Sequence, residues 1–411
     1  MRRMPEARRL DVLLRSGAPV EGQVEAIARV MATFHDRQPP SPAADQSAGA
    51  STLARLWKAN SESLRRFGSG IVDLAAVDSV EHLALRYLAG RAVLFRARIA
   101  AGRARDGHGD LQADDVFCLD DGPRVLDCLE FDDRLRCGDV LGDVAFLAMD
   151  LERLGRPDLG ALFLRTYRDH AGDSWPASLA HHHIAYRAQV RAKVAAIRAG
   201  QGSEDAIQRS RHLLDLALEH LEAARVRLVV VGGLPGTGKS TVATGLAAGL
   251  GATLLRSDQV RKELSGIPPT RAAAASFGGG IYDAGSTAAT YNELLARGGR
   301  ALAAGESVVL DASWHDPAWR ARAEQVADAA TADLVELRCS APLDVARRRL
   351  LDRRLLGHDA SDATAEVLAV MAETDVPWPT AADIDTTGDR EDAVRRALSI
   401  VTASDEQRAA A

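Results

Sequence analysis

Two hydrophobic patterns divide the chain. Up to about residue 225 the apolar positions recur mostly every three to four residues, which predicts helices. The predicted helices are 1–36, 52–67, 79–104, 139–154, 157–171, 179–199 and 204–224. From residue 226 onward, short continuous apolar runs such as RLVVVGG alternate with helical segments. This alternation predicts a parallel α/β sheet that is covered by helices on both faces.

Two segments interrupt the helical pattern before residue 225. The stretch PPSPAADQSAGAS at 39–51 is rich in Pro, Ser and Gly and is predicted to be a loop. In VFCLDDGPRVLDCLEF, apolar and polar residues alternate around Asp121-Gly122, which indicates a β-hairpin. The first 225 residues should therefore form a mainly helical domain with one small β element.

The second region reads as an α/β domain. Its predicted strands are RLVVVGG, 252–255, 307–312, 332–339 and 382–387. Its predicted helices are 239–250, 285–304, 317–329, 342–356, 362–374 and 390–402. The expected domains are therefore 1–225 and 226–411.

Composition and charge narrow the class of protein. The formal net charge of −6 argues against a surface that coats nucleic acid. The four cysteines form no C-x-x-C pair, which is typical of a reduced, cytoplasmic protein. The basic N-terminus MRRMPEARRL is followed by no apolar stretch, so a signal peptide is not expected, and no run is long enough to span a bilayer. The sequence does not determine an oligomeric state.

The strongest chemical signal is GLPGTGKST at 233–241. It matches G-x-x-x-x-G-K-[ST] and lies between a predicted strand and a predicted helix, as this motif requires. Glycines allow the backbone N–H groups to turn toward phosphate oxygens at a helix N-terminus. The residues expected to bind ATP are Gly233, Leu234, Pro235, Gly236, Thr237, Gly238, Lys239, Ser240 and Thr241. Lys239 would reach the β- and γ-phosphates, and the Ser240 hydroxyl would bind Mg²⁺.

Asp258 and Arg261 follow the second predicted strand of this region in the segment SDQVR. Three positions apart at a helix start, their side chains face the same side. A carboxylate there can accept a proton from an attacking hydroxyl, and an arginine can hold an anionic acceptor. The alternative is an aspartate that caps the helix and an arginine that is solvated.

Further downstream, Asp311 ends an apolar strand, where a carboxylate could hold Mg²⁺ through water. Arg349 and Arg353 lie four apart on an arginine-rich helix and could cover the phosphates during transfer. A solvated basic helix face is the alternative for these arginines.

Together the motifs GLPGTGKS, SDQVR, VVLDA and RLLDR resemble those of P-loop kinases such as polynucleotide 5′-kinase, zeta toxins and gluconate kinase-like enzymes. The resemblance implies that Asp258 is the base for the acceptor hydroxyl and that Arg261 contacts the acceptor. It also implies lid roles for Arg349 and Arg353, with ATP and Mg²⁺ as cofactors. It does not identify the acceptor.

A second motif, HGDLQADD at 108–115, resembles the catalytic loop of aminoglycoside phosphotransferase-like proteins. By that resemblance Asp110 would orient an acceptor, and Asp115 stands where the family has a metal-binding Asn. The next metal-binding carboxylate falls nearest Glu130, with Asp132 as a second candidate. The segment GDVLGDVAFLAMDLE, with Asp139 and Asp143, resembles a helix start of the same family.

The residues before this loop contain no G-x-G-x-x-G and no strand-rich region, and their single lysine is Lys58. Residues 1–225 are therefore interpreted as a kinase-like C-lobe without its β-lobe, and Asp110, Asp115 and Glu130 as a vestigial site. The whole chain resembles bacterial fusions of an aminoglycoside phosphotransferase-like domain with a P-loop kinase domain. The run His181-His182-His183 is interpreted as a structural coincidence, because adjacent helical residues point in different directions.

These observations favour an ATP- and Mg²⁺-dependent kinase that phosphorylates a hydroxyl of a sugar, nucleoside or nucleotide-sugar. One alternative is an ATP-dependent regulatory or binding protein with slow hydrolysis. Another is a kinase for nucleic-acid ends, which the acidic balance disfavours. A third assigns antibiotic phosphorylation to HGDLQADD.

Overall fold

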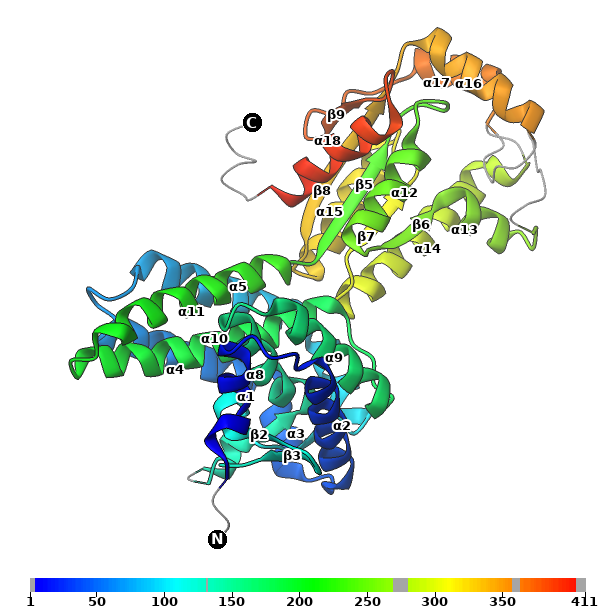
Figure 1. Ribbon diagram of the computed structural model, residues 1–411. Coiled ribbons are helices and arrows are strands. Elements are labelled where there is room, and N and C mark those ends of the chain that lie inside the picture. Colours follow the sequence, from blue (N-terminus) through cyan, green and yellow to red (C-terminus); the bar gives the residue numbers. More distant parts are fainter. Residues whose placement is uncertain (1–3, 131, 269–279, 357–362, 404–411) are drawn as a thin grey trace. The chain divides into compact units, whose positions relative to one another are not determined.

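The computed structural model describes residues 4–130, 132–268, 280–356 and 363–403 (Figure 1). The chain divides between Arg225 and Val226 into two compact units. Each unit has its own pattern of secondary structure, and the two are described separately.

Helices form most of the N-terminal unit. They are α1 (Leu10–Arg15), α2 (Glu21–Arg37), α3 (Pro42–Ala48), α4 (Ala50–Phe67), α5 (Leu74–Gly90), α6 (Ala92–Ala100), α7 (Asp133–Arg136), α8 (Val140–Arg153), α9 (Pro157–Ala171), α10 (Ala177–Gly200) and α11 (Glu204–Ala223), with the 3-10 helices η1 (Glu6–Arg8) and η2 (Ala113–Asp115). The central helix is α8, which is buried at every position from Val140 to Leu151. It packs against α9 and α10. Burial on all sides places this helix in the middle of the core, with the charged Asp143 and Asp150 buried inside it.

Two antiparallel strand pairs complete this unit. The expected hairpin is confirmed: β2 (Val116–Leu119) pairs with β3 (Gly122–Val125). A second pair, β1 (Ala104–Asp106) with β4 (Cys137–Asp139), was not predicted. Each of these strands has three residues, which is too short to show an alternating pattern.

The prediction of a loop at 39–51 was wrong, because α3 lies within this segment and α4 begins at Ala50. The Ser41 side chain accepts a hydrogen bond from the N–H of Ala44, and Pro42 occupies the first helical turn. Proline and serine are favoured at a helix start as well as in loops. Similarly, 79–104 is not one helix, because α5 and α6 are separated at Arg91.

The C-terminal unit is built on a five-stranded sheet. Its strands are β5 (Arg227–Gly232), β6 (Thr253–Arg256), β7 (Val308–Asp311), β8 (Asp333–Ser340) and β9 (Ala382–Asp385). The spatial order is β6-β7-β5-β8-β9, and every neighbouring pair is parallel. The predicted parallel sheet is thus confirmed, with β5 at its centre.

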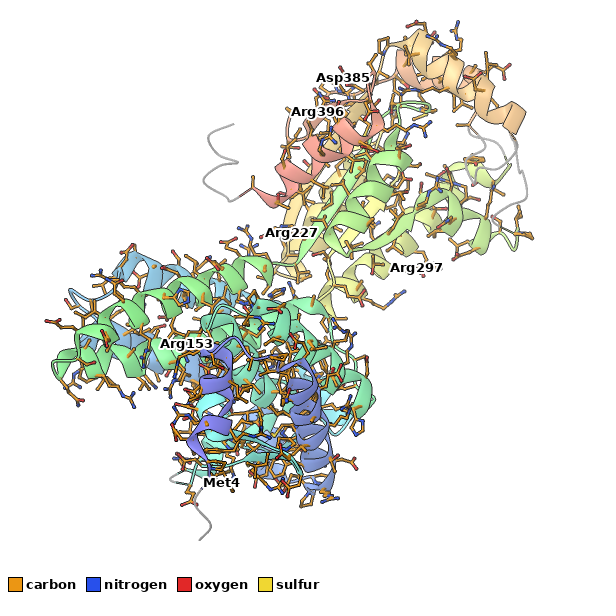
Figure 2. All side chains as sticks on the ribbon, in the orientation of Figure 1. Met4, Arg153, Arg227, Arg297, Asp385 and Arg396 are labelled. Carbon is orange, nitrogen blue, oxygen red and sulfur yellow. The ribbon has the colours of Figure 1, made fainter. Side chains whose placement is uncertain are left out.

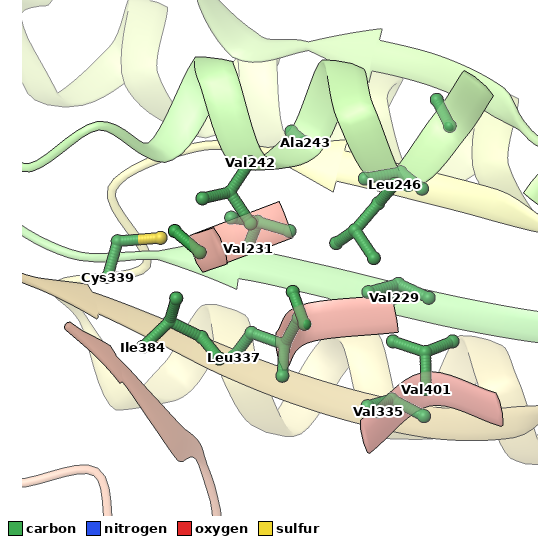
Figure 3. Close-up of a cluster of buried hydrophobic side chains, with 14 residues drawn as sticks. Val229, Val231, Val242, Ala243, Leu246, Val335, Leu337, Cys339, Ile384 and Val401 are labelled. Carbon is green, nitrogen blue, oxygen red and sulfur yellow. The ribbon is translucent and has the colours of Figure 1, made fainter. Parts of the chain in front are cut away.

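Helices cover both faces of this sheet. They are α12 (Lys239–Leu250), α13 (Ser257–Leu264), α14 (Ala284–Ala303), α15 (Pro317–Ala329), α16 (Leu343–Leu356), α17 (Ala365–Glu373) and α18 (Arg390–Thr402), with the 3-10 helix η3 (Gly280–Tyr282). Over one face, Leu246 of α12 and Val401 of α18 join strand residues such as Val231 and Ile384 in a buried cluster (Figure 3). On α18, the Arg396 guanidinium donates to the Asp385 carbonyl at the end of β9 (both labelled in Figure 2). The helices α14 and α15 pack against β5, β7 and β8.

Among the residues that the structure describes, no helix combines the length and the apolar character that a membrane crossing requires.

Candidate active site

The segment Gly233–Thr241 follows the central strand β5 and enters α12. Three of its glycines have left-handed backbone conformations, with φ of 128° at Gly233, 79° at Gly236 and 83° at Gly238. Glycine adopts this region without the steric penalty of a side chain. Within the described part of the chain, the N–H groups of Gly236 and Gly238 donate no hydrogen bond. They remain available to an anion, as a phosphate cradle requires.

Close packing also explains these glycines. A Cβ atom on Gly233 would lie 2.3 Å from the Cys339 carbonyl oxygen, and one on Gly236 would lie 2.4 Å from the Ala346 carbonyl oxygen. Both neighbours are backbone atoms, which cannot rotate away. The loop is therefore held between the end of β8 and the first turn of α16.

Lys239 and Thr237 close the loop on itself. The Lys239 ammonium donates to the Leu234 carbonyl oxygen at 2.8 Å, and the Thr237 hydroxyl donates to the same oxygen at 2.7 Å. Thr237 is buried, whereas Ser240 is partly exposed on the first turn of α12. The lysine thus lies over the loop, with its ammonium turned toward the Leu234 carbonyl oxygen.

Asp311 lies at the same edge of the sheet. Its register partners are Val231 on β5 and Arg256 on β6. The carboxylate is buried and accepts a hydrogen bond from Arg256 Nε at 3.2 Å. Burial raises the pKa of the neighbouring Cys339 thiol to about 12, while Lys239 lowers it and Asp311 raises it. Lys239 and Asp311 therefore both lie near the Cys339 thiol, which the sequence pattern alone could not show.

Asp258 and Arg261 belong to the short helix α13, which begins directly after β6. Asp258 is partly exposed in the first turn, and Arg261 is buried. Arg261 Nη1 donates to the Ile281 carbonyl oxygen at 2.9 Å and to the Thr287 hydroxyl at 3.2 Å. Its guanidinium also lies 4.7 Å from the ring centroid of Tyr282. Arg261 is therefore not a solvated surface arginine.

Tyr291 of α14 connects these residues to the end of β7. Its hydroxyl lies 3.1 Å from the Ser313 hydroxyl and accepts the N–H of Trp314 at 3.2 Å. Burial raises the pKa of Tyr291, Arg261 lowers it and Asp258 raises it, so both charged groups lie near this ring. Trp314 has a left-handed backbone, with φ of 52°, which is rare for a bulky residue.

Sequence reasoning missed Ser313 and the residues that hold its loop. The buried Arg320 donates to the Trp314 carbonyl oxygen at 2.6 Å and to the Pro377 carbonyl oxygen at 3.0 Å. The Ser313 carbonyl in turn accepts the N–H of Gly233 at 3.2 Å, which joins this loop to the phosphate loop. The position of Ser313, two residues after a strand-ending aspartate, was the available signal.

The proposed lid arginines are placed only in part. Arg349 of α16 donates from Nη2 to the Thr386 carbonyl oxygen at 2.6 Å, and the Thr386 hydroxyl donates to the Thr237 carbonyl oxygen at 2.8 Å. Arg349 is thus joined to the phosphate loop through Thr386, the first residue after β9. The side chain of Arg353 lies outside the described residues.

The carboxylates of HGDLQADD lie in the N-terminal unit. Asp110 Oδ2 is 3.6 Å from Arg191 Nη1, and burial raises the pKa of Asp110. Burial also raises the pKa of Asp115 to about 7, and Asp114, Asp110 and Asp127 raise it further. Asp127, which has a left-handed φ of 61°, and the predicted Glu130 are both exposed. Within the described residues, no three acidic, His or Cys side chains are arranged to hold a metal ion.

The histidine run belongs to the core of this unit. His182 and His183 are buried, and His182 stacks on Tyr87 at 4.6 Å between ring centroids. His181 Nδ1 lies 2.8 Å from His220 Nδ1. The three rings point to different surroundings, as the interpretation of the run as structural requires.

Comparisons with known proteins identify relatives of both units. A family model described as an AAA domain matches residues 228–375. The uncharacterized proteins Rv2004c of Mycobacterium tuberculosis (strain ATCC 25618 / H37Rv) and Mb2027c of Mycobacterium bovis (strain ATCC BAA-935 / AF2122/97) are each 43% identical over 401 residues. The alignment covers 97% of this chain and 80% of each relative.

Solved structures match a smaller part of the chain. A gluconokinase from Sinorhizobium meliloti 1021 is 22% identical, with a TM-score of 0.29, and the match covers 42% of this chain and 89% of that one. A sugar kinase from Janibacter sp. HTCC2649 is 19% identical, with a TM-score of 0.30, and the match covers 44% and 99%. The C-terminal unit thus carries an AAA-type P-loop domain, and the chain as a whole belongs to the family of the mycobacterial proteins Rv2004c and Mb2027c.

Proposed function

We propose that the C-terminal unit is an ATP- and Mg²⁺-dependent kinase that phosphorylates a hydroxyl group of a small molecule of the sugar, nucleoside or nucleotide-sugar class. The observation that carries this proposal is the meeting of two sets of residues at one edge of the sheet. A glycine-lined loop with Lys239 follows β5, and Asp258 and Arg261 follow β6, beside Asp311 at the end of β7. Parallel sheets bind their ligands at this edge.

The residues fit ATP and Mg²⁺. The free N–H groups of Gly236 and Gly238 and the ammonium of Lys239 suit phosphate oxygens, which carry negative charge. Ser240 and Asp311 supply the oxygen ligands that Mg²⁺ prefers. When bound, ATP supplies the transferable phosphoryl group and Mg²⁺ neutralises its developing charge. Asp311 would then exchange its hydrogen bond from Arg256 for the metal or its water.

Asp258 and Arg261 act on the acceptor in this proposal. Asp258 is partly exposed and can accept the proton of an incoming hydroxyl. Arg261 is held by Ile281 and Thr287, while its Nε is buried and has no hydrogen-bond partner among the described residues. A buried donor of this kind can orient an acceptor oxygen. Arg349, with Arg353, would cover the phosphates from α16.

For the N-terminal unit we propose a kinase-like C-lobe that takes no part in this transfer. Asp143 at the start of α8 accepts the N–H groups of His108 and Gly109, at 2.9 and 2.8 Å. An acidic helix start that holds the loop HGDLQADD supports the family resemblance of this unit. Arg191 lies beside Asp110, and this pairing gives Asp110 a structural partner.

Labelled ATP and a panel of sugars, nucleosides, nucleotide-sugars and a 5′-hydroxyl oligonucleotide would test the proposal. We expect transfer to one small molecule, and a loss of about 10²- to 10⁴-fold in Asp258→Asn without a loss of ATP affinity. Asp328→Asn, which changes an exposed aspartate on α15, is the matched control. Equal transfer by wild type and Asp258→Asn would exclude Asp258 as the base.

The same assay separates the alternatives. Slow hydrolysis that no acceptor changes would favour the regulatory protein, and labelling of the oligonucleotide would favour the nucleic-acid-end kinase. Activity that survives Lys239→Ala but is lost in Asp110→Ala would assign the chemistry to HGDLQADD instead.

A further inference from the structure

A cavity of about 270 Å³ lies within the N-terminal unit, and none of its lining residues belongs to HGDLQADD. It is bounded by α2, by the turn from α6 into β1 and by α9. Its polar side chains are Thr33, His35, Arg103, Arg105, Tyr167 and His170. The exposed Asp36 at the rim is the acidic residue of this lining. Two arginines, Arg103 and Arg105, therefore line one small cavity that is partly open to solvent.

Arg105 is the cation without a counter-ion. Within the described residues it forms no hydrogen bond and no ion pair, and its Nη1 atom is buried. On the other face of β1, Asp106 is already paired with Arg136 at 2.6 Å. A buried guanidinium N–H without a partner is unfavourable, because it has lost water and gained nothing in return. Such groups are uncommon unless a ligand, ion or water satisfies them.

The backbone makes room for this guanidinium. Arg105 pairs with Gly138 across the β1–β4 ladder. Its Nη2 atom also lies over Gly102, at 3.3 Å from the position that a Cβ atom would occupy. Gly102 has a left-handed φ of 67°. Gly102 thus leaves space for the Arg105 guanidinium.

Arg103, the second arginine of the cavity, is held in place by hydrogen bonds and an ion pair. Its Nη2 donates to the Gly172 carbonyl oxygen at 2.9 Å and its Nη1 to the Ala171 carbonyl oxygen at 3.3 Å. Its Nε lies 3.2 Å from Asp173, a carboxylate that also pairs with the buried Arg98. Asp173 is thus shared between two arginines and is not available to Arg105. Arg103 is positioned, and Arg105 is unpaired.

The inner wall adds two fixed polar groups. His35 Nδ1 lies 2.8 Å from the Tyr167 hydroxyl, and His35 Nε2 lies 3.0 Å from Asp143. Asp143 in turn holds the backbone of His108 and Gly109. A ligand that contacts Tyr167 or His35 would therefore stabilise the packing of this unit.

We propose that this cavity is a binding site for a small molecule that carries an oxyanion, either a phosphate or a carboxylate. The oxyanion accepts hydrogen bonds from the Arg105 guanidinium, whose planar fork matches two oxygens of either group. The rest of the molecule lies toward Thr33 and His170. The volume suits a small metabolite, since it lies near the lower end of the roughly 300–1,000 Å³ that ligand sites span.

Calorimetric titration of the full chain with inorganic phosphate, acetate and malonate at constant ionic strength tests this site. A Lys239→Ala background removes the main cation of the phosphate loop, so that phosphate bound there does not interfere. We expect saturable binding of at least one of these anions. Arg105→Ala should weaken it about tenfold to a hundredfold, which is the contribution of a charge-assisted pair. Preference for phosphate or for the carboxylates tells which oxyanion the site takes.

Arg105→Lys keeps the charge but lacks the fork, and should give an intermediate affinity. If Arg105→Ala does not fold, Arg105→Lys still tests whether Arg105 binds the anion. Arg96→Ala, an exposed arginine on α6, is the matched control and should bind as the parent does. Absence of saturable binding by all three anions, or equal affinity in the parent and in the folded Arg105 variants, would overturn the proposal.

Discussion

A methyl group at Gly236 provides a sharp test of the phosphate loop. Gly236→Ala places a Cβ atom 2.4 Å from the Ala346 carbonyl oxygen, whereas ordinary contact begins at 3.4 Å. The shortfall is 3.4 − 2.4 = 1.0 Å. Because the neighbour is backbone, either the phosphate loop or the first turn of α16 must move by about this distance. A displacement of about 1 Å in a catalytic site can reduce the rate about 100-fold.

Gly251→Ala separates this clash from backbone strain. Gly251 has a left-handed φ of 60° at the end of α12, close to the value of 79° at Gly236, but nothing lies within 4 Å of its added Cβ. Both variants should lose about 1–2 kcal/mol of unfolding free energy from the left-handed backbone alone. Gly236→Ala should lose more, because the steric term is added.

The assays are urea unfolding of the C-terminal unit within the full chain, ATP binding by calorimetry, and phosphoryl transfer or ATP hydrolysis. We expect Gly251→Ala to keep its ATP affinity and turnover, and Gly236→Ala to lose about 100-fold in turnover together with most of its ATP affinity. If the two variants bind and turn over ATP within about threefold of each other, the loop around Gly236 is not the phosphate cradle.

Three further predictions concern stability and the support of the loop. Arg98→Ala removes the ion-pair partner of the buried Asp139 carboxylate and leaves Asp173 with Arg103 alone, and should reduce the free energy of unfolding by about 3–5 kcal/mol in urea denaturation. Arg65→Ala, which breaks the exposed pair with Asp78, should change the free energy of unfolding by less than about 1 kcal/mol. Equal losses in Arg98→Ala and Arg65→Ala would contradict the reasoning. Burial lowers the pKa of His181 and of His183 to about 4, below the usual value of 6.5. As the pH falls, the unfolded chain binds protons at these histidines before the folded chain does. The thermal midpoint of the N-terminal unit should therefore fall as the pH drops from 6.5 to 4, and it should fall less in His183→Gln. If both proteins show the same pH profile, His183 is excluded as a cause of the pH dependence. Thr386→Val removes the hydroxyl that donates to the Thr237 carbonyl oxygen, and should lower the free energy of unfolding by about 1–3 kcal/mol and weaken ATP binding. The control Thr387→Val changes an exposed threonine and should change neither quantity. Thermal melts measure the stability and calorimetry measures the ATP affinity.

Local patterns were enough to predict the phosphate loop and the sheet beneath it. The apolar run before Gly233 and the glycines up to Lys239 encode strand, turn and helix within a few residues, and the structure places β5 and α12 there. The same reasoning failed at 39–51, since Ser41 and Pro42 are signals for a helix start as well as for a loop. It also missed β1 and β4, because three residues show no period.

The roles of individual residues required the tertiary structure. The sequence indicated that Asp258, Arg261 and Asp311 follow strands, but not that Asp311 pairs with Arg256 or that Arg261 is buried against Tyr282. In the other unit the sequence named Glu130 and Asp132 but not Asp127, whose negative charge adds to the raised pKa of Asp115.

The sequence by itself determined the parts of this protein that depend on neighbours along the chain: most of the helices, the hairpin, the parallel strands and the glycine loop. The tertiary structure alone decided which parts meet. The strand order β6-β7-β5-β8-β9 brings the ends of β7 and β9 to the loop after β5, although many residues separate them in the chain. Ser313 and Thr386 contact the phosphate loop for this reason. Hydrophobic periodicity specifies the face that a segment buries, whereas its partner is selected by packing across the whole fold.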